Sequence, residues 1–231
     1  MVFSPDEWTA IRLSLQVAAL AVALSLGPGI LCAWLLARGR FRGRLLLEAV
    51  ISLPLILPPV VTGYVLLIAF GRKGWAGQWL ESLFGLVLSF RWTGAALAAA
   101  IMGFPLMVQA IRISMEAIDQ RLEDAASTLG ARPILVFLTV TLPLSLPGIL
   151  VGTVLSFARA MGEFGATITF VSAIPGETQT LASAIYASLQ DPDGDATVWR
   201  LTILSIVIAF SAILLSGVAS RAVARRIGAA R

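Results

Sequence analysis

Two charged side chains stand inside an otherwise apolar run, and their position gives them the clearest chemical potential in the sequence. Arg159 and Glu163 are four residues apart, a spacing that predicts one face of a helix. A charge inside a membrane is expensive, so it is a functional hypothesis by default. In one interpretation the pair lines a water-filled path or a subunit seam, where Arg159 attracts an anion. In the other it is a mutually satisfied structural pair, and the residues alone leave both open. Gly162 and Gly165 adjoin the pair, where a helix could flex.

The residue sets that common enzyme sites need are missing from the sequence. With no histidine and one cysteine, Cys32, the chain cannot form a conventional Ser–His–Asp or Cys–His centre, and most metal sites are excluded. A phosphate-binding P-loop needs Gly-Lys followed by Ser or Thr, but the only lysine, Lys73, precedes a glycine. We therefore predict that the chain is not an enzyme, and that it binds neither a metal nor a cofactor itself.

A polar segment between two long apolar runs predicts a short helix that could dock another protein. Asp119 can accept hydrogen bonds from the free N–H groups at the start of such a helix. An apolar stripe at helical spacing follows, formed by Leu122, Ala125, Ala126 and Leu129. Gly130 suits the left-handed position after a helix, and Pro133 prevents the helix from continuing. On this pattern alone, an ordinary amphipathic loop helix is the better prediction.

The composition places these elements in a membrane protein. The 231 residues are 58% hydrophobic and only 13% charged, whereas a soluble domain is about one quarter charged. Runs long enough to cross a bilayer, which takes about 20 apolar residues, lie at roughly 11–37, 45–70, 93–111, 147–171 and 201–223. We expect an all-α, polytopic protein with about five transmembrane helices. The second run contains Pro54, Pro58 and Pro59, which predict a helix that is kinked or broken near one end.

The distribution of basic residues predicts the orientation. Eleven arginines fall in the 38–44 loop, in the 112–146 loop and near the C-terminus, against five basic residues on the opposite side. Because basic loops stay in the cytoplasm, we predict an external N-terminus and an internal C-terminus. Residues 1–10 then form an external, periplasmic segment, residues 11–223 form one transmembrane domain, and residues 224–231 form a cytoplasmic basic tail. The docking helix lies in the cytoplasmic 112–146 loop.

The segment 123–143 resembles the "EAA" loop of ATP-binding-cassette (ABC) importer permeases. The family pattern is E-A-A, three residues, G, nine residues, I, any residue, L-P, and its spacing is kept here by Asp124, Ala125, Ala126, Gly130, Val140, Leu142 and Pro143. Asp124 replaces the usual Glu and Val140 the usual Ile, and Glu123 could share the acidic role. The stretch 157–180, with its Gly162–Ala166 core, is similar to oxyanion permeases and most of all to molybdate permeases, as are residues 54–64 and 104–108.

This resemblance implies a type-I ABC importer permease of the bacterial inner membrane that imports molybdate. It implies two permease subunits, forming a homodimer, together with two separate ATPase subunits that bind ATP and Mg²⁺ and an external oxyanion-binding protein. Membrane lipid is a further partner, and nucleic acid is not. Coupling to the ATPase would run through Glu123, Asp124, Ala125, Ala126, Gly130, Leu142 and Pro143. A sulfate/thiosulfate or tungstate permease is the nearer alternative. A stand-alone ion-coupled transporter and a membrane-embedded enzyme are alternatives from other classes.

Overall fold

The chain folds into helices throughout the part that the structure describes, in agreement with the all-α prediction. This computed structural model describes residues 3–228, and the side chains of these residues except 219 and 222–228. The elements are α1 (Pro5–Arg38), α2 (Arg44–Ile56), α3 (Pro59–Phe70), α4 (Trp75–Phe84), α5 (Trp92–Glu116), α6 (Gln120–Thr128), α7 (Pro133–Val136), the π-helical segment η1 (Phe137–Thr141), α8 (Leu142–Leu144), α9 (Leu146–Met161), α10 (Gly165–Val171), α11 (Leu181–Ser188) and α12 (Asp195–Gly228).

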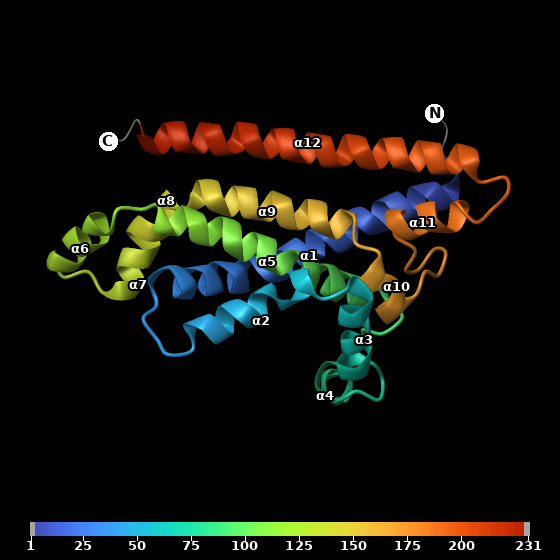
Figure 1. The fold of residues 1–231 in the computed structure, drawn as a ribbon, viewed down its shortest axis with the longest axis horizontal. Coiled ribbons are helices and arrows are strands. Elements are labelled where there is room, and N and C mark those ends of the chain that lie inside the picture. Colours follow the sequence, from blue (N-terminus) through green and yellow to red (C-terminus); the bar gives the residue numbers. More distant parts are fainter. Residues whose placement is uncertain (1–2, 229–231) are drawn as a thin grey trace.

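The helices form an elongated bundle with α5 in its interior. In Figure 1, α9 lies between α5 and α12, and α12 forms an outer layer along the whole bundle. Within their most apolar stretches, 67% of α5 is buried against the rest of the chain, compared with 6% of α12. An apolar helix with so little protein contact needs another apolar surface, such as lipid or a second subunit.

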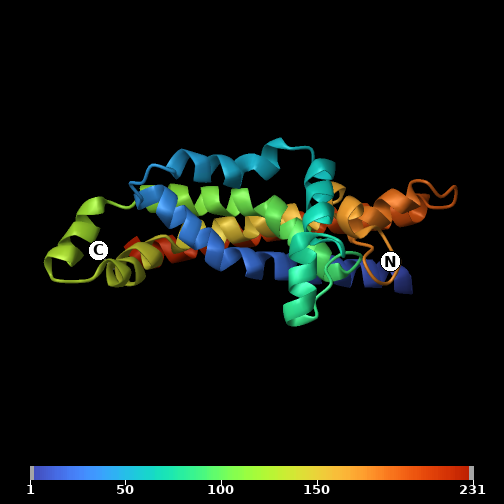
Figure 2. The ribbon, with the colours of Figure 1, turned by 90° about the horizontal axis from the view of Figure 1, so that it is seen from below.

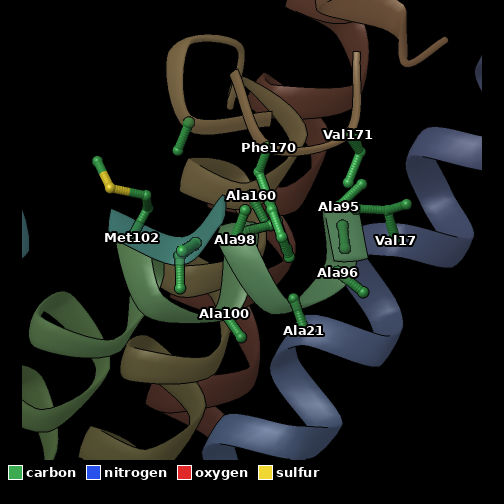
Figure 3. Packing of buried hydrophobic residues seen from close by; sticks show 14 of the residues in the cluster. Val17, Ala21, Ala95, Ala96, Ala98, Ala100, Met102, Ala160, Phe170 and Val171 are labelled. Atoms are coloured by element: carbon green, nitrogen blue, oxygen red, sulfur yellow. The ribbon is translucent and has the colours of Figure 1, made fainter. Parts of the chain in front are cut away.

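Small side chains bring the central helices close together. The largest buried cluster is built around alanines of α5, including Ala95, Ala98 and Ala99, which pack against α1, α9 and α10 (Figure 3). Gly148 and Gly152 of α9 also meet α5 so closely that an added Cβ would lie within 3.0 Å of its atoms. In lipid, helices associate through such close packing because hydrophobic burial adds little.

The expected second span is broken in its middle, not near one end. Leu57 and Pro58 each precede a proline and both take extended backbone conformations, with ψ angles of 141° and 133°. The ring of a following proline disfavours the helical conformation, so two consecutive residues leave the helix here. The axes of α2 and α3 differ by 113°, and Figure 2 shows α3 turned across the direction of α2.

The expected fourth span is also interrupted. α9 ends at Met161 and α10 begins at Gly165, so residues 162–164 separate the two helices. α9 has 16 residues and is about 24 Å long, shorter than the roughly 30 Å of a hydrocarbon core. At its other end it continues, across a bend of 69°, from residues Pro133–Leu144, which sequence analysis had placed in the loop. Within the described residues, three unbroken helices are long and apolar enough to span a membrane, or up to five spans if each bent pair counts as one.

The first and last spans begin earlier than predicted. α1 starts at Pro5 and α12 at Asp195, not at residues 11 and 201, so most of the supposed N-terminal segment is helical. Part of the expected basic tail continues α12 to Gly228, and residues 229–231 lie outside the described range. The segments 71–92 and 172–200, which lie between expected spans, contain the short helices α4 and α11.

The three arginine-rich regions gather at one end of the bundle. Figure 1 shows the loop between α1 and α2, the helix α6 and the end of α12 at one end, while α11 and the start of α1 lie at the other. The arginines are thus concentrated at one end of the bundle, as the predicted orientation requires. Which side of the membrane this end faces stays a prediction.

Candidate functional site

The helix α6 forms as the sequence predicts, because a capping residue precedes it and a glycine follows it. Asp119 takes an extended conformation, and its carboxylate accepts a hydrogen bond from the backbone N–H of Arg121 at 3.0 Å. This satisfies one of the free donors at the helix start. Gly130 follows the helix with a φ of 87°, a conformation that strains any residue with a Cβ. The predicted capping role of Asp119 and the left-handed geometry of Gly130 are both confirmed.

The docking face of α6 is available to another protein. No residue of α6 is buried. Asp124 and Ala125 are exposed and Ala126 is half-buried, while Leu129, just after the helix, has 89% of its surface exposed. Figure 1 shows α6 beyond the end of the bundle, away from the long helices. An apolar stripe with an adjacent carboxylate is therefore free for contact.

Glu123 points in a different direction from Asp124. Its Oε2 atom accepts a hydrogen bond from Nε of Arg38 at 2.8 Å, and its Oε1 atom accepts one from the hydroxyl of Thr141 at 2.7 Å. Arg38 ends α1 and Thr141 ends η1. Glu123, which the sequence suggested as a second acidic docking residue, is thus hydrogen-bonded within its own chain.

The Leu142–Pro143 end of the motif coincides with a change in helix type. Pro143 has no N–H to donate, and its ring crowds the carbonyl four residues earlier. The preceding turn widens into η1, where the N–H of Leu142 donates to the carbonyl of Phe137, five residues back. Such π-helical turns are rare and occur preferentially at functional sites. Leu142 and Pro143 thus shape the π-helical turn whose last residue, Thr141, hydrogen-bonds to Glu123. They do not extend the exposed face of α6.

The Arg159–Glu163 pair exists, but not on one helix face as predicted. Glu163 lies beyond the end of α9, in the break before α10. Its Oε2 is 2.6 Å from Nη1 of Arg159, and its Oε1 accepts a hydrogen bond at 2.8 Å from the N–H of Ala166 in α10. The Glu163 side chain is 1% exposed and that of Arg159 is 27% exposed. The carboxylate therefore holds the two halves of a broken span together, which is a structural role in itself.

The two glycines beside this pair differ in what surrounds them. A Cβ on Gly162 would be 3.8 Å from the nearest atom, the carbonyl oxygen of Ala158. A Cβ on Gly165 would be 2.7 Å from Cβ of Pro59, because the start of α10 packs against the start of α3. Gly165 therefore permits a close helix crossing, whereas Gly162 has room around it.

A second buried ion pair was missed by sequence analysis. Glu7 is 4% exposed, and its Oε1 is 2.6 Å from Nη2 of Arg200, so the starts of α1 and α12 are joined. The signal for the earlier helix start was present: Ser4 and Glu7 form a capping box, with Pro5 at the first helical position. No local signal could pair Glu7 with Arg200, because 193 residues separate them.

A third set of ion pairs joins α2 to α5 near the same end as α6. Arg112 contacts Glu48 at 2.7 Å and Glu116 at 2.8 Å, and Arg44 lies 3.7 Å from Glu116. Among the described residues, no group of three or more His, Cys, Asp or Glu side chains is arranged to hold a metal ion. The charged side chains at this end thus connect helices to one another.

Comparison with known proteins places this arrangement in a family. The family of binding-protein-dependent transport system inner membrane components matches residues 29–225. The chain belongs to this family. It is thus a multi-pass component of the inner membrane that works in a transport system with a binding protein, which disfavours the stand-alone ion-coupled transporter.

Several curated relatives match almost the whole chain. The molybdenum transport system permease protein ModB of Escherichia coli K12 is 56% identical over 216 residues, 94% of each chain. ModB of Haemophilus influenzae is 52% identical, over 96% of this chain and 97% of its own. The sulfate transport system permease protein CysT of Salmonella typhimurium is 35% identical, over 93% of this chain and 76% of its own.

Solved structures confirm the predicted importer permease fold. A bacterial ABC transporter involved in the import of the acidic polysaccharide alginate has a chain that superposes with a TM-score of 0.74 at 18% identity. The superposition covers 95% of this chain and 80% of that one. At this identity the likeness carries the fold alone.

Proposed function

We propose that this chain is the permease subunit of an ATP-driven molybdate importer. The observation that carries the proposal is the 56% identity with the E. coli molybdenum permease across nearly the full length of both chains. Identity with the sulfate permease is 35%, so a sulfate or thiosulfate importer is the weaker candidate. Tungstate, another tetrahedral oxyanion, remains the nearer rival.

In the proposed mechanism, separate ATPase subunits bind ATP and Mg²⁺ and dock on the exposed face of α6. Two copies of the permease form the translocation path as a homodimer, and an external binding protein delivers the oxyanion. The N-terminus lies outside the cell and the C-terminus inside, so that α6 faces the cytoplasm. ATP binding closes the ATPases and switches the permease between outward-facing and inward-facing states. The ATPases can shift this equilibrium only through their different affinity for the two states.

Substrate selection rests mainly on the external binding protein in this mechanism. The permease needs to admit an oxyanion and release it, which favours weak contacts along the path. Arg159 is the candidate for such a contact, because its side chain is partly exposed beside the break between α9 and α10. Its pairing with Glu163 lowers the net charge that an anion would meet.

The test is uptake in cells that lack their own molybdate permease and express this chain with the ATPase and binding protein that co-purify with it. We expect ATP-dependent accumulation of molybdate that excess tungstate inhibits strongly and excess sulfate weakly. Accumulation of sulfate in preference to molybdate would assign the chain to the sulfate class. Failure of any ATPase to co-purify from membranes would remove the ABC mechanism itself.

A further inference from the structure

The attachment of α6 to the rest of the chain is unusually slight. None of its residues is fully buried, so apolar packing contributes little to fixing its position. It is connected through two short turns, and the second contains Gly130 with a φ of 87°. A cavity of about 490 Å³ is lined by residues of α6, the end of α1 and η1. A helix held in this way would swivel when a partner pushes on it, unless side chains bridge the gap.

One side chain makes that bridge. Among the described residues, Glu123 is the one on α6 whose side chain has hydrogen bonds to elements beyond α6 and its flanking turns. Its carboxylate uses both oxygens, one toward Arg38 at 2.8 Å and one toward Thr141 at 2.7 Å. Arg38 in turn donates from Nη2 to the carbonyls of Met115 at 2.9 Å and Ile118 at 3.2 Å, just where α5 ends.

The environment makes these contacts stronger than an ordinary surface ion pair. The side chains of Arg38 and Glu123 are 13% and 16% exposed, and Thr141 is 1% exposed. Limited contact with water weakens screening, and hydrogen bonds that involve a charged group are stronger than those between neutral groups. A cation at the carboxyl end of α5 also complements the free carbonyls there.

We infer that Glu123 is the positioning residue that transmits movement of α6 into the transmembrane helices, through a latch formed by Arg38, Glu123 and Thr141. The inference rests on the proposed function and divides the acidic pair between two tasks. Asp124 borders the same cavity but is exposed and, among the described residues, has no hydrogen bond to α1 or η1, so it is the carboxylate assigned to the ATPase. Glu123 is turned inward and pulls on α1, η1 and the end of α5. Successive residues on a helix point about 100° apart, so two adjacent carboxylates can be directed at different partners.

The test compares variants of these residues in the complete complex of permease, ATPase and binding protein. In Glu123→Gln, which keeps the shape but removes the charge, we expect normal co-purification of the ATPase. The oxyanion moved per ATP hydrolysed should fall about tenfold, the effect of losing roughly 1.4 kcal/mol of a charge-assisted hydrogen bond. Thr141→Val should act in the same direction more weakly. Asp124→Asn should instead lower ATPase binding.

Arg40→Gln is the matched control. Arg40 lies two residues after Arg38, is exposed, and has no ion pair among the described residues. It should leave both ATPase binding and the coupling ratio unchanged. If Glu123→Gln loses the ATPase as Asp124→Asn does, Glu123 is a docking residue and the latch is wrong. Full coupling in Glu123→Gln would also overturn the inference.

A second measurement examines the latch without transport. In the full-length permease in lipid nanodiscs, trypsin can cleave after Arg121 only when α6 opens, and cleavage after Arg72, in the turn before α4, serves as an internal reference. Loss of the latch should speed cleavage after Arg121 about tenfold relative to the reference, because cleavage follows the population of the open form. Equal rates in the wild type and Glu123→Gln would remove the latch. Faster cleavage combined with no oxyanion uptake by the wild type would retain the latch and refute the proposed function.

Discussion

Replacing Gly63 with alanine tests the contact that joins the two broken spans. Gly63 lies in α3 and faces α10, so that an added Cβ would be 2.5 Å from the carbonyl oxygen of Ala166 and 2.8 Å from Cβ of Thr169. It would also be 2.9 Å from the Cα atom of Ala166. Two of these three atoms belong to the backbone, so a change of rotamer cannot relieve the clash.

The size of the effect follows from these distances. Ordinary contact begins at 3.4 Å, so α10 must recede by about 0.9 Å from the 2.5 Å approach. Overpacking of this kind costs about 1–3 kcal/mol. Alanine recovers up to about 1 kcal/mol of that through its higher helix propensity. We therefore expect Gly63→Ala to destabilise the fold by up to about 2 kcal/mol. Uptake should fall as well, because the α3–α10 contact adjoins the break that holds Glu163.

Thermal unfolding of the purified protein in detergent measures the first effect, and oxyanion uptake measures the second. Gly217→Ala is the matched control, since Gly217 is also inside a helix. Among the described residues, its Cβ would meet only the end of the Arg221 side chain, at 3.9 Å. This control should melt at or above the wild-type temperature. If Gly63→Ala melts together with Gly217→Ala, α3 and α10 do not approach as described, and the reasoning is refuted.

Three further predictions concern the motif, the topology and the buried pair. Gly130→Leu should stay in the membrane but lose ATPase crosslinking and uptake. Space for the side chain is available, but a residue with a Cβ at a φ of 87° is strained by about 1–2 kcal/mol. Normal uptake would contradict the coupling role of the loop. In a background without the native cysteine, Phe41→Cys should react with an impermeant thiol reagent only after permeabilisation and Gln190→Cys in intact spheroplasts, whereas the reverse pattern would overturn the orientation. Arg159→Ala should impair assembly of the permease because it leaves the buried carboxylate of Glu163 without its cation. If Arg159 contacts the anion, the double variant Arg159→Ala with Glu163→Ala should restore assembly but not uptake. Recovery of uptake in this double variant would favour a purely structural pair.

Features that depend on neighbouring residues were predicted well from the sequence. The cap at Asp119 and the left-handed turn at Gly130 each follow from the chemistry of one residue and its immediate backbone. The prolines at 58 and 59 indicated a broken helix for the same reason. The position of that break was wrong, because hydrophobicity continues unchanged through Leu57 and marks only the ends of the apolar run.

Features that depend on distant residues were not predictable in this way. The buried pair of Glu7 and Arg200 joins the two ends of the sequence, and no pattern relates them. The direction of Glu123 depends on Arg38, which is 85 residues earlier. In the sequence, Asp124 holds the acidic position of the motif and Glu123 precedes it. Only the arrangement of helices shows that the Glu123 carboxylate is directed toward Arg38 and Thr141.

The two broken spans meet one another through their second halves. α3 and α10 both begin at a break, and they cross where Gly63 faces Ala166 and Gly165 faces Pro59. The central helices α1 and α5 are instead continuous and joined by close-packed alanines, which resist relative movement. In the proposed latch, a push on α6 reaches this rigid pair first, through Arg38 and the end of α5. Motion between states is then expected at the breaks, where Glu163 and two close glycine contacts lie between the half-helices. Variants at the breaks should therefore alter transport while leaving ATPase binding intact.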